Sequence, residues 1–288
     1  MRAPLNLIDR LYLLYLAVLA ALAAWCSHAA TMLTILHVTI GLLIWILAAN
    51  QDRSPVVRFL HDWYPLAMFI FSFEEVARFS LAVVPHWQDF HVMSFEQHVF
   101  SVLPNLLALR IYSRPFSELM AFGYFSYYPL FPAVSGMLYT RKDKQPFRNL
   151  VLESVLMYLI VFAVYIGFPT EGPRHALAGF QAPPTGWFFG WLVQFIQAGA
   201  GVHGNALPSS HVGLAFLCAL SAQRVLPRVA PFIWVSLCLI CAGAVYYGYH
   251  YISDVLAGVV VALTAATLRS LIVSLSCRMN RQSTVANA

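Results

Sequence analysis

Long runs of apolar residues recur along the chain, and they constrain its fold more than any other feature. A helix that crosses a bilayer needs roughly 20 mostly apolar residues. We count eight such runs, at about 11–27, 31–49, 64–84, 116–139, 149–168, 207–226, 230–249 and 252–274. Only 10% of the 288 residues are charged, too few to cover a water-soluble fold of this size. Because helices satisfy their own backbone groups in lipid, we expect an all-α, polytopic membrane bundle of about eight helices in a single domain, 1–288.

The shorter stretches at about 95–111 and 186–199 are too polar or too short to span, which favours helices lying at the membrane interface. The first apolar run resembles a signal peptide with a loose cleavage site at Ser27 to Ala29, but its length favours an uncleaved helix.

The distribution of positive charge predicts the orientation. Lysines and arginines from Arg2 to Arg281 concentrate in alternate segments, whereas the other segments hold only Arg110, Arg114 and Arg174. The positive-inside rule then places both termini in the cytoplasm. We expect a plasma (inner) membrane of the bacterial type. The net charge of +5 forms no broad basic face, so we expect no nucleic-acid partner. The five cysteines suggest neither a disulfide nor a zinc site, and we expect no metal and no cofactor.

Under this topology three polar clusters reach the same outer edge of the membrane. They are Pro169 to His175, Leu207 to His211, and Tyr249 to Asp254. Scattered structural polar residues would have no reason to align at one depth, so their convergence predicts a site on the extracytoplasmic side.

Each cluster contributes a different chemistry. His250 and Asp254 are four residues apart and share one helix face, so the carboxylate can fix the imidazole tautomer. Ser209 and Ser210 stand at a predicted helix start, which offers free amides to an anion, with His211 beside them as a proton donor. Arg174 can bind a phosphate through two hydrogen bonds. Taken singly, each cluster is equally compatible with a helix cap, a buried polar pair or a solvated loop arginine.

At these residues the sequence resembles the type 2 phosphatidic acid phosphatase superfamily. Its three signatures are a Lys/Arg stretch ending in Arg-Pro, then Pro-Ser-Gly-His, then Ser-Arg-x5-His-x3-Asp. The counterparts are Gly172 to Arg174, Pro208 to His211 and His250 to Asp254, within a matching region of about 150–274 that upstream helices complete to a six-helix core.

The resemblance implies a role for each residue. His250 would be the nucleophile that forms a phosphohistidine, Asp254 would orient it, and His211 would protonate the leaving alcohol and then activate the acceptor. Arg174, Ser209 and Ser210 would hold the phosphoryl oxygens. The implied substrate is a lipid phosphate ester.

Several positions depart from the signatures. Gly167 replaces the lysine, His175 the proline, and Ser210 the glycine, while Gly243 and Ala244 replace the Ser-Arg pair. A His-Tyr-x-x-Asp motif without that arginine is also similar to inositol phosphorylceramide and sphingomyelin synthases, which imply transfer of a phospho-headgroup to a second lipid. Hydrolysis and transfer therefore both stay open. A transporter or channel is the rival from another class, although it would more often show repeated halves and midplane sites.

Other polar residues allow two interpretations each. Glu74, Glu75 and Arg78 lie within the third run, where Glu74 and Arg78 predict an internal ion pair or a contribution to a headgroup pocket. His175 and His203 flank the predicted site and could tune it.

Overall fold

The computed structural model describes residues 5–26, 30–108, 110–178, 180–183, 186–200 and 204–286. His203 and Ser27 to Ala29 lie outside these residues. The chain divides into two compact units, Met1–His86 and Trp87–Ala288, which are described separately. The single domain expected from the sequence stays a prediction.

The first unit consists of three helices: α1 (Leu7–Cys26), α2 (Ala30–Asn50) and α3 (Pro55–Val83). Asn6 and Asp9 cap α1 reciprocally, because each backbone N–H donates to the other's side chain, at 2.8 and 3.0 Å. Ser54 caps α3 by accepting from the Val57 amide, and Pro55 stands in the first turn, where its missing N–H costs nothing.

Buried polar contacts lie inside this unit. Asp9 is fully buried and lies 3.1 Å from Nε2 of His61, and it accepts a 2.9 Å bond from the Tyr64 hydroxyl. Glu75 turns inward, 3.5 Å from Nε2 of His37.

The ion pair expected between Glu74 and Arg78 is absent. Both side chains lie exposed on α3, and no salt bridge joins them in the described structure.

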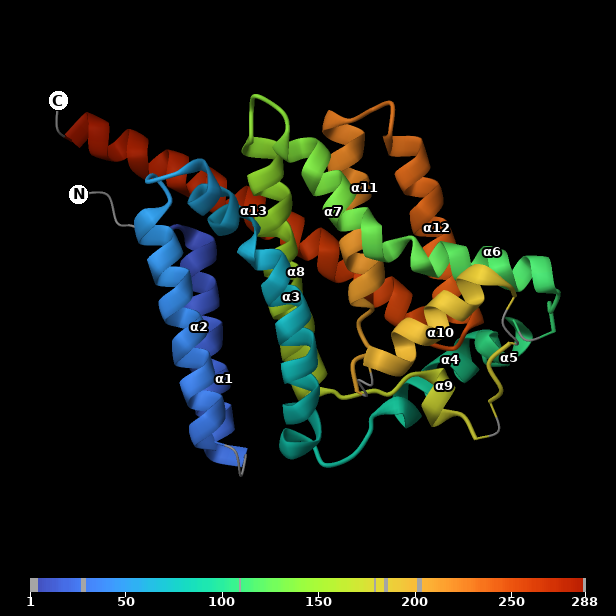
Figure 1. The fold of residues 1–288 in the computed structure, drawn as a ribbon. Helices are drawn as coiled ribbons and strands as arrows, with labels where there is room; N and C mark the ends of the chain where they lie inside the picture. Colours follow the sequence, from blue (N-terminus) through green and yellow to red (C-terminus); the bar gives the residue numbers. More distant parts are fainter. Residues whose placement is uncertain are drawn as a thin grey trace. The chain divides into compact units, whose positions relative to one another are not determined.

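The second unit contains the remaining helices. They are α4 (Asp89–Phe100), α5 (Pro104–Ala108), α6 (Arg114–Phe125), α7 (Tyr127–Tyr139), α8 (Gln145–Gly167), α9 (Pro173–Ala176), α10 (Phe188–Ala200), α11 (Ser210–Val225), α12 (Ala230–Tyr246) and α13 (Ile252–Ala286). Helices α8, α11 and α13 pack against one another, and α12 packs against α11 and α6. The short helices α4, α5, α9 and α10 gather at one end of this unit, where α11 and α13 also begin (Figure 1).

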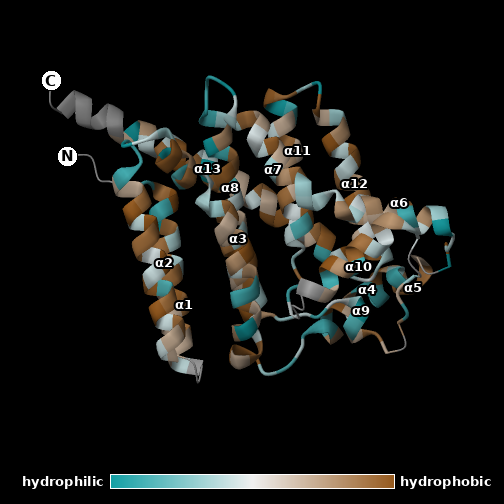
Figure 2. Cartoon of the chain, viewed as in Figure 1, coloured by the Kyte–Doolittle hydropathy of each residue, from teal (hydrophilic) through white to brown (hydrophobic). Residues whose placement is uncertain are grey.

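The prediction of an all-helical membrane protein is confirmed. Among the described residues, four helices have the length and hydropathy to cross a membrane: Leu7–Trp25, Ala30–Asn50, Gln145–Gly167 and Ile252–Met279. Figure 2 shows hydrophobic residues predominating along α1 and α2, with hydrophilic residues at the loops.

Helices also occupy the other four expected runs, with differences in length and polarity. The run 116–139 is divided between α6 and α7 at Ser126, whose hydroxyl donates to the Gly123 carbonyl at 2.6 Å. Helices α11 and α12 have 16 and 17 residues. Helix α3 is 29 residues long but carries several charged side chains.

An ion cluster joins three helices at the opposite end of the second unit from the signatures. Glu153 on α8 accepts from Nε and Nη2 of Arg269 on α13, at 3.0 and 2.8 Å. Arg224 on α11 lies 3.8 Å from the same oxygen. The helices that carry His211 and Asp254 are therefore also tied together through Arg224 in the last turn of α11 and Arg269 in the middle of α13.

Candidate active site

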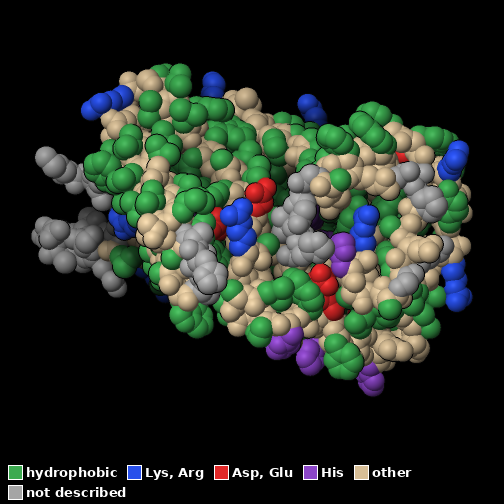
Figure 3. Space-filling view, turned by 60° about the horizontal axis from the view of Figure 1, so that its bottom comes forward, with side chains coloured by type: hydrophobic (Ala, Val, Ile, Leu, Met, Phe, Trp, Pro, Cys, Tyr) green, Lys and Arg blue, Asp and Glu red, His purple; other side chains and the backbone are tan. Residues whose placement is uncertain are grey.

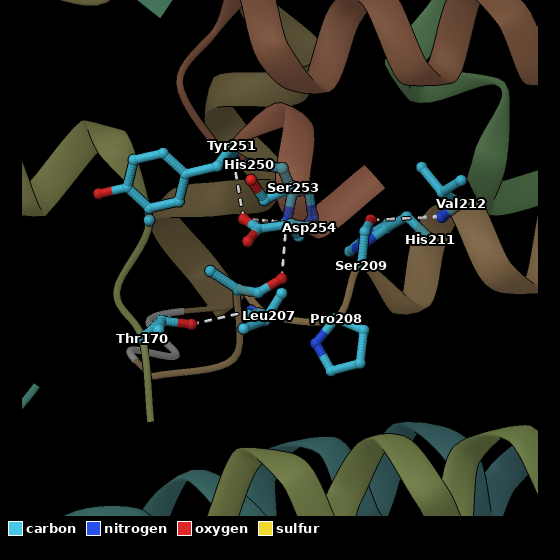
Figure 4. A network of polar contacts seen from close by, with 12 residues as sticks. Thr170, Leu207, Pro208, Ser209, His211, Val212, His250, Tyr251, Ser253 and Asp254 are labelled. Atoms are coloured by element: carbon cyan, nitrogen blue, oxygen red, sulfur yellow. Dashed lines mark hydrogen bonds and ion pairs between the residues drawn. The ribbon is translucent and has the colours of Figure 1, made fainter. Parts of the chain in front are cut away.

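Backbone hydrogen bonds bring the three polar clusters together. The Ala206 amide donates to the Thr170 carbonyl at 3.1 Å, and the Leu207 amide donates to the Thr170 hydroxyl at 2.8 Å. The Arg174 amide donates to the Gly248 carbonyl at 2.8 Å, and the Ser209 amide to the Asp254 carbonyl at 2.9 Å. The convergence expected from topology is thus present at the level of single bonds, as Figure 4 shows for the second and third clusters.

His250 occupies the turn between α12 and α13, and it is almost fully buried. Its Nδ1 lies 2.9 Å from the Ala206 carbonyl and 3.5 Å from Oδ2 of Asp254 (Figure 4). A carbonyl oxygen can only accept, so Nδ1 carries the proton and Nε2 keeps its lone pair in the neutral ring. The sequence assigned this tautomer control to Asp254, but the nearer acceptor is a carbonyl of the second cluster.

Asp254 is fully buried in the first turn of α13. Its Oδ2 accepts from the Tyr251 amide at 2.8 Å, so the carboxylate also caps the helix that carries it. This arrangement places a carboxylate beside the His250 ring.

His211 lies in the first turn of α11 with its ring centroid 5.7 Å from that of His250. The rings of Tyr127 and Tyr124 enclose it, at centroid distances of 4.2 and 5.4 Å. The Tyr124 hydroxyl lies 3.5 Å from Nε2, and Nδ1 has no hydrogen-bond partner. The two imidazoles therefore lie close together, with tyrosine rings around His211.

The proposed phosphate-binding residues have different surroundings. Ser209 is the N-cap of α11, and its hydroxyl oxygen accepts from the Val212 amide at 3.4 Å. Ser210 is buried and begins the helix. Arg174 is half-buried; its Nη1 donates to the Tyr249 hydroxyl at 3.0 Å and the guanidinium lies 5.3 Å from the Tyr249 ring centroid. No carboxylate pairs with Arg174 in the described residues, so its charge is available to an anion.

The departures from the signatures have a packing explanation at α12. A Cβ on Gly243 would lie 2.5 Å from the Met120 carbonyl oxygen and 3.2 Å from Cβ of Tyr124, both on α6. Ala244 is fully buried. At the two positions where the signature has serine and arginine, α12 therefore packs directly against α6. His175 is exposed next to Arg174.

Three further residues support the site and were not singled out from the sequence. Asp89 accepts from the amides of Glu171 and Gly172, Glu96 accepts from the amide and hydroxyl of Ser253, and Asn105 donates to the carbonyl of His250. Glu96 and Asn105 lie in the stretch of about 95–111 that the sequence indicated only as interfacial, and Asp89 lies before it. No motif in the sequence marks these three residues. Viewed toward this end, basic, acidic and histidine side chains lie at the surface among hydrophobic ones (Figure 3).

Burial perturbs two ionisable groups here. The pKa of the Glu96 carboxyl lies above its ordinary value because of burial, and the hydrogen bonds from Ser253 lower it in part. Burial, and then the Asp89 carboxylate, raise the pKa of the Tyr251 phenol well above its ordinary range, so Tyr251 stays a donor. Among the described residues no cluster of histidines, cysteines and carboxylates has the geometry of a metal site.

The described residues thus form an integral membrane protein in which the imidazoles of His250 and His211 lie close together, with His211 in the first turn of α11 and Arg174 in the loop that is bonded to Gly248. The family model of the PAP2 superfamily matches residues 91–268, more than half of the chain, and the chain belongs to this superfamily. Membership supports a phosphatase-type enzyme in general.

One curated relative is the PA-phosphatase related-family protein of Dictyostelium discoideum, 26% identical over 130 residues. The match covers 41% of this chain and 22% of the relative's length. No solved structure matches the chain significantly.

Proposed function

We propose that this protein transfers the phosphoryl group of a lipid phosphate ester through a phosphohistidine on His250, at the extracytoplasmic face of the membrane. The observation that carries the proposal is the hydrogen bond from Nδ1 of His250 to the Ala206 carbonyl, because it leaves Nε2 unprotonated beside His211.

In the first step Nε2 of His250 attacks phosphorus, and the bond between phosphorus and the lipid alcohol breaks. His211 in its protonated form donates its proton to the departing alkoxide oxygen. The positive charge on the phosphorylated imidazole is stabilised by Asp254. Arg174 and the first amides of α11 would hold the phosphoryl oxygens, with the hydroxyls of Ser209 and Ser210 as further donors.

In the second step His211, now neutral, takes a proton from the acceptor hydroxyl. The acceptor oxygen attacks phosphorus, the P–N bond breaks, and His250 recovers its lone pair. Water as the acceptor gives inorganic phosphate, whereas a lipid alcohol gives a new phospholipid. The roles of His250, His211 and Asp254 follow from the family resemblance and are supported by this geometry.

Transfer to a second lipid is the alternative favoured by a specific observation. Gly243 and Ala244 pack against α6 where the phosphatase signature has serine and arginine, so fewer cations surround the phosphate. The rings of Tyr124 and Tyr127 lie next to the His211 ring, and the Tyr249 ring stacks on Tyr124. A transporter or channel remains the rival of another class, and no contact in the structure favours it.

The test uses purified protein with lipids that carry labelled phosphate, without added metal, in the presence and absence of acceptor lipids. We expect label on the wild-type protein that acid removes and alkali does not, and none on His250→Ala. The exposed His98 on α4 gives the matched control His98→Ala, which should label like the wild type. Labelled inorganic phosphate would identify a phosphatase and a labelled new phospholipid a transferase. Equal turnover by wild type and His250→Ala would refute the proposal.

The orientation is tested separately in intact cells. A C-terminal tag should be inaccessible to an impermeant reagent, since both termini are predicted to be cytoplasmic. Labelling of the tag from outside the cell would place the proposed active site on the cytoplasmic face instead.

A further inference from the structure

Helix α4 directs two buried carboxylates at the turn that carries His250. Asp89 and Glu96 are seven residues apart, so they lie on one face of the helix, two turns from each other. Both are buried. The Glu96 Oε1 accepts from the amide and hydroxyl of Ser253, at 2.7 and 2.9 Å. Asp89 makes the more unusual connection, because it joins two of the three clusters.

The oxygen Oδ1 of Asp89 accepts two hydrogen bonds from different clusters. One comes from the Gly172 amide at 2.9 Å and the other from the Tyr251 hydroxyl at 3.2 Å. Oδ2 accepts from the Glu171 amide at 2.8 Å. Gly172 precedes Arg174 by two residues, and Tyr251 directly follows His250. One atom therefore joins the loop of the phosphate-binding arginine to the turn of the nucleophile.

We propose that Asp89 is a positioning residue that sets the placement of Arg174 relative to His250. The inference rests on the proposed function, and it adds a residue from outside the three signatures to the same site. Asp89 does not touch the reacting atoms in this scheme. It acts through the backbone at Gly172 and through the Tyr251 hydroxyl.

The loop at Gly172 has little freedom to compensate for a lost tether. Gly172 has φ of +87°, and a Cβ there would lie 2.6 Å from the Tyr249 carbonyl oxygen. The loop is held on its far side by the bond from the Arg174 amide to Gly248. The raised pKa of Tyr251 keeps its hydroxyl protonated, so it remains a donor to Asp89. Loss of the carboxylate should therefore move the loop rather than be absorbed locally.

Asp89→Asn is the informative substitution because it preserves size. An asparagine has one acceptor oxygen and an NH₂ group, so one of the two backbone amides would face another donor. Glu118→Gln is the matched control. Glu118 also accepts from three backbone amides, those of Trp187 and Phe189 at 2.7 Å and that of Gly190 at 3.2 Å, but it caps α10 and contacts neither cluster.

We expect Asp89→Asn to lower kcat/KM for a lipid phosphate by roughly 10- to 100-fold at equal folded fraction, as misplacement of a binding group does. KM should rise, and inhibition by inorganic phosphate should weaken in parallel, because both depend on Arg174. Glu118→Gln should shift the melting temperature and leave KM and phosphate inhibition unchanged. A purely structural role for Asp89 would give that same pattern.

Tyr251→Phe removes only the link to the nucleophile turn. We expect it to lower kcat with little change in KM, and to add nothing to the loss caused by Asp89→Asn in the double variant. If Asp89→Asn does not fold, Tyr251→Phe alone decides the test, and an unchanged kcat in that variant overturns the inference. Asp89→Asn behaving like Glu118→Gln, while His250→Ala is inactive, also overturns it. Equal activity of His250→Ala and wild type would instead refute the proposed function.

Discussion

The Thr170 hydroxyl is the side-chain link between the first two clusters, which makes Thr170→Val a stringent perturbation. Valine keeps the shape and the β-branch, and it removes only the acceptor of the Leu207 amide. Thr170 is fully buried, and its own carbonyl still accepts from Ala206. A buried donor left without a partner costs about 1–3 kcal/mol. In a protein of this size that corresponds to a fall in the melting temperature of roughly 2–10 °C.

The functional effect should be larger than this stability loss indicates. Leu207 follows Ala206, whose carbonyl fixes the tautomer of His250. Displacement of this segment would therefore weaken the hydrogen bond from Nδ1 of His250 to the Ala206 carbonyl. We expect kcat for a lipid phosphate to fall by roughly 10-fold, since a group that sets protonation state is worth about that much or more. The assay combines thermal unfolding in detergent with initial rates at matched folded concentration.

The control is Thr264→Val on α13. Its hydroxyl donates to the Val260 carbonyl within the same helix and is exposed, so its loss should change stability by less than about 0.5 kcal/mol. If Thr170→Val matches this control in both melting temperature and kcat, the argument that Thr170 holds the second cluster in place is wrong.

Three other substitutions test separate parts of the structure. Gly172→Ala should destabilise the protein by more than about 1–2 kcal/mol, the cost of a side chain at positive φ, and raise KM by displacing Arg174; normal melting and KM would contradict the assigned backbone geometry. Glu153→Leu leaves Arg269 without its carboxylate partner and should lower the free energy of unfolding by roughly 2–4 kcal/mol in thermal melts, without changing KM. The loss is limited because the long arginine side chain can extend toward water. The raised pKa of Glu96 means that the folded state binds its proton more tightly than the unfolded state, so this residue's contribution to stability falls as pH rises from the ordinary glutamate value through the raised pKa. Melts of wild type and Glu96→Gln across that window should converge at the acidic end, and a constant difference would refute the assignment.

The helical membrane class was predictable because lipid leaves few alternatives to a helix, and apolar run length reports directly on it. The meeting of the three clusters was predictable for the same reason, since topology alone fixes their depth. Helix boundaries were less so. The run 116–139 is a single span by hydropathy, but the structure divides it at Ser126, and hydropathy averages do not register such an interruption.

The supporting residues of the site could not be assigned from the sequence. Asp89 and Glu96 lie more than 80 residues from the groups they bind. The sequence pattern indicates only an interfacial helix around Glu96 and nothing at Asp89. Even at His250 the pattern suggested Asp254 as the partner of Nδ1, whereas the carbonyl of Ala206 is nearer. A backbone carbonyl carries no residue-type signal, so sequence patterns are silent about it.

The contact between α6 and α12 has a consequence for how this enzyme can diverge. Gly243 meets the Met120 carbonyl, and a Cβ on Gly123 would meet Leu239 at 2.7 Å, so each helix presents a glycine to the other's backbone. A serine or arginine introduced on this stretch of α12 would first have to separate the two helices, and Tyr124 beside His211 would move with α6. Substitutions toward the Ser-Arg signature are therefore unfavourable one at a time and become accessible only after compensating changes on α6.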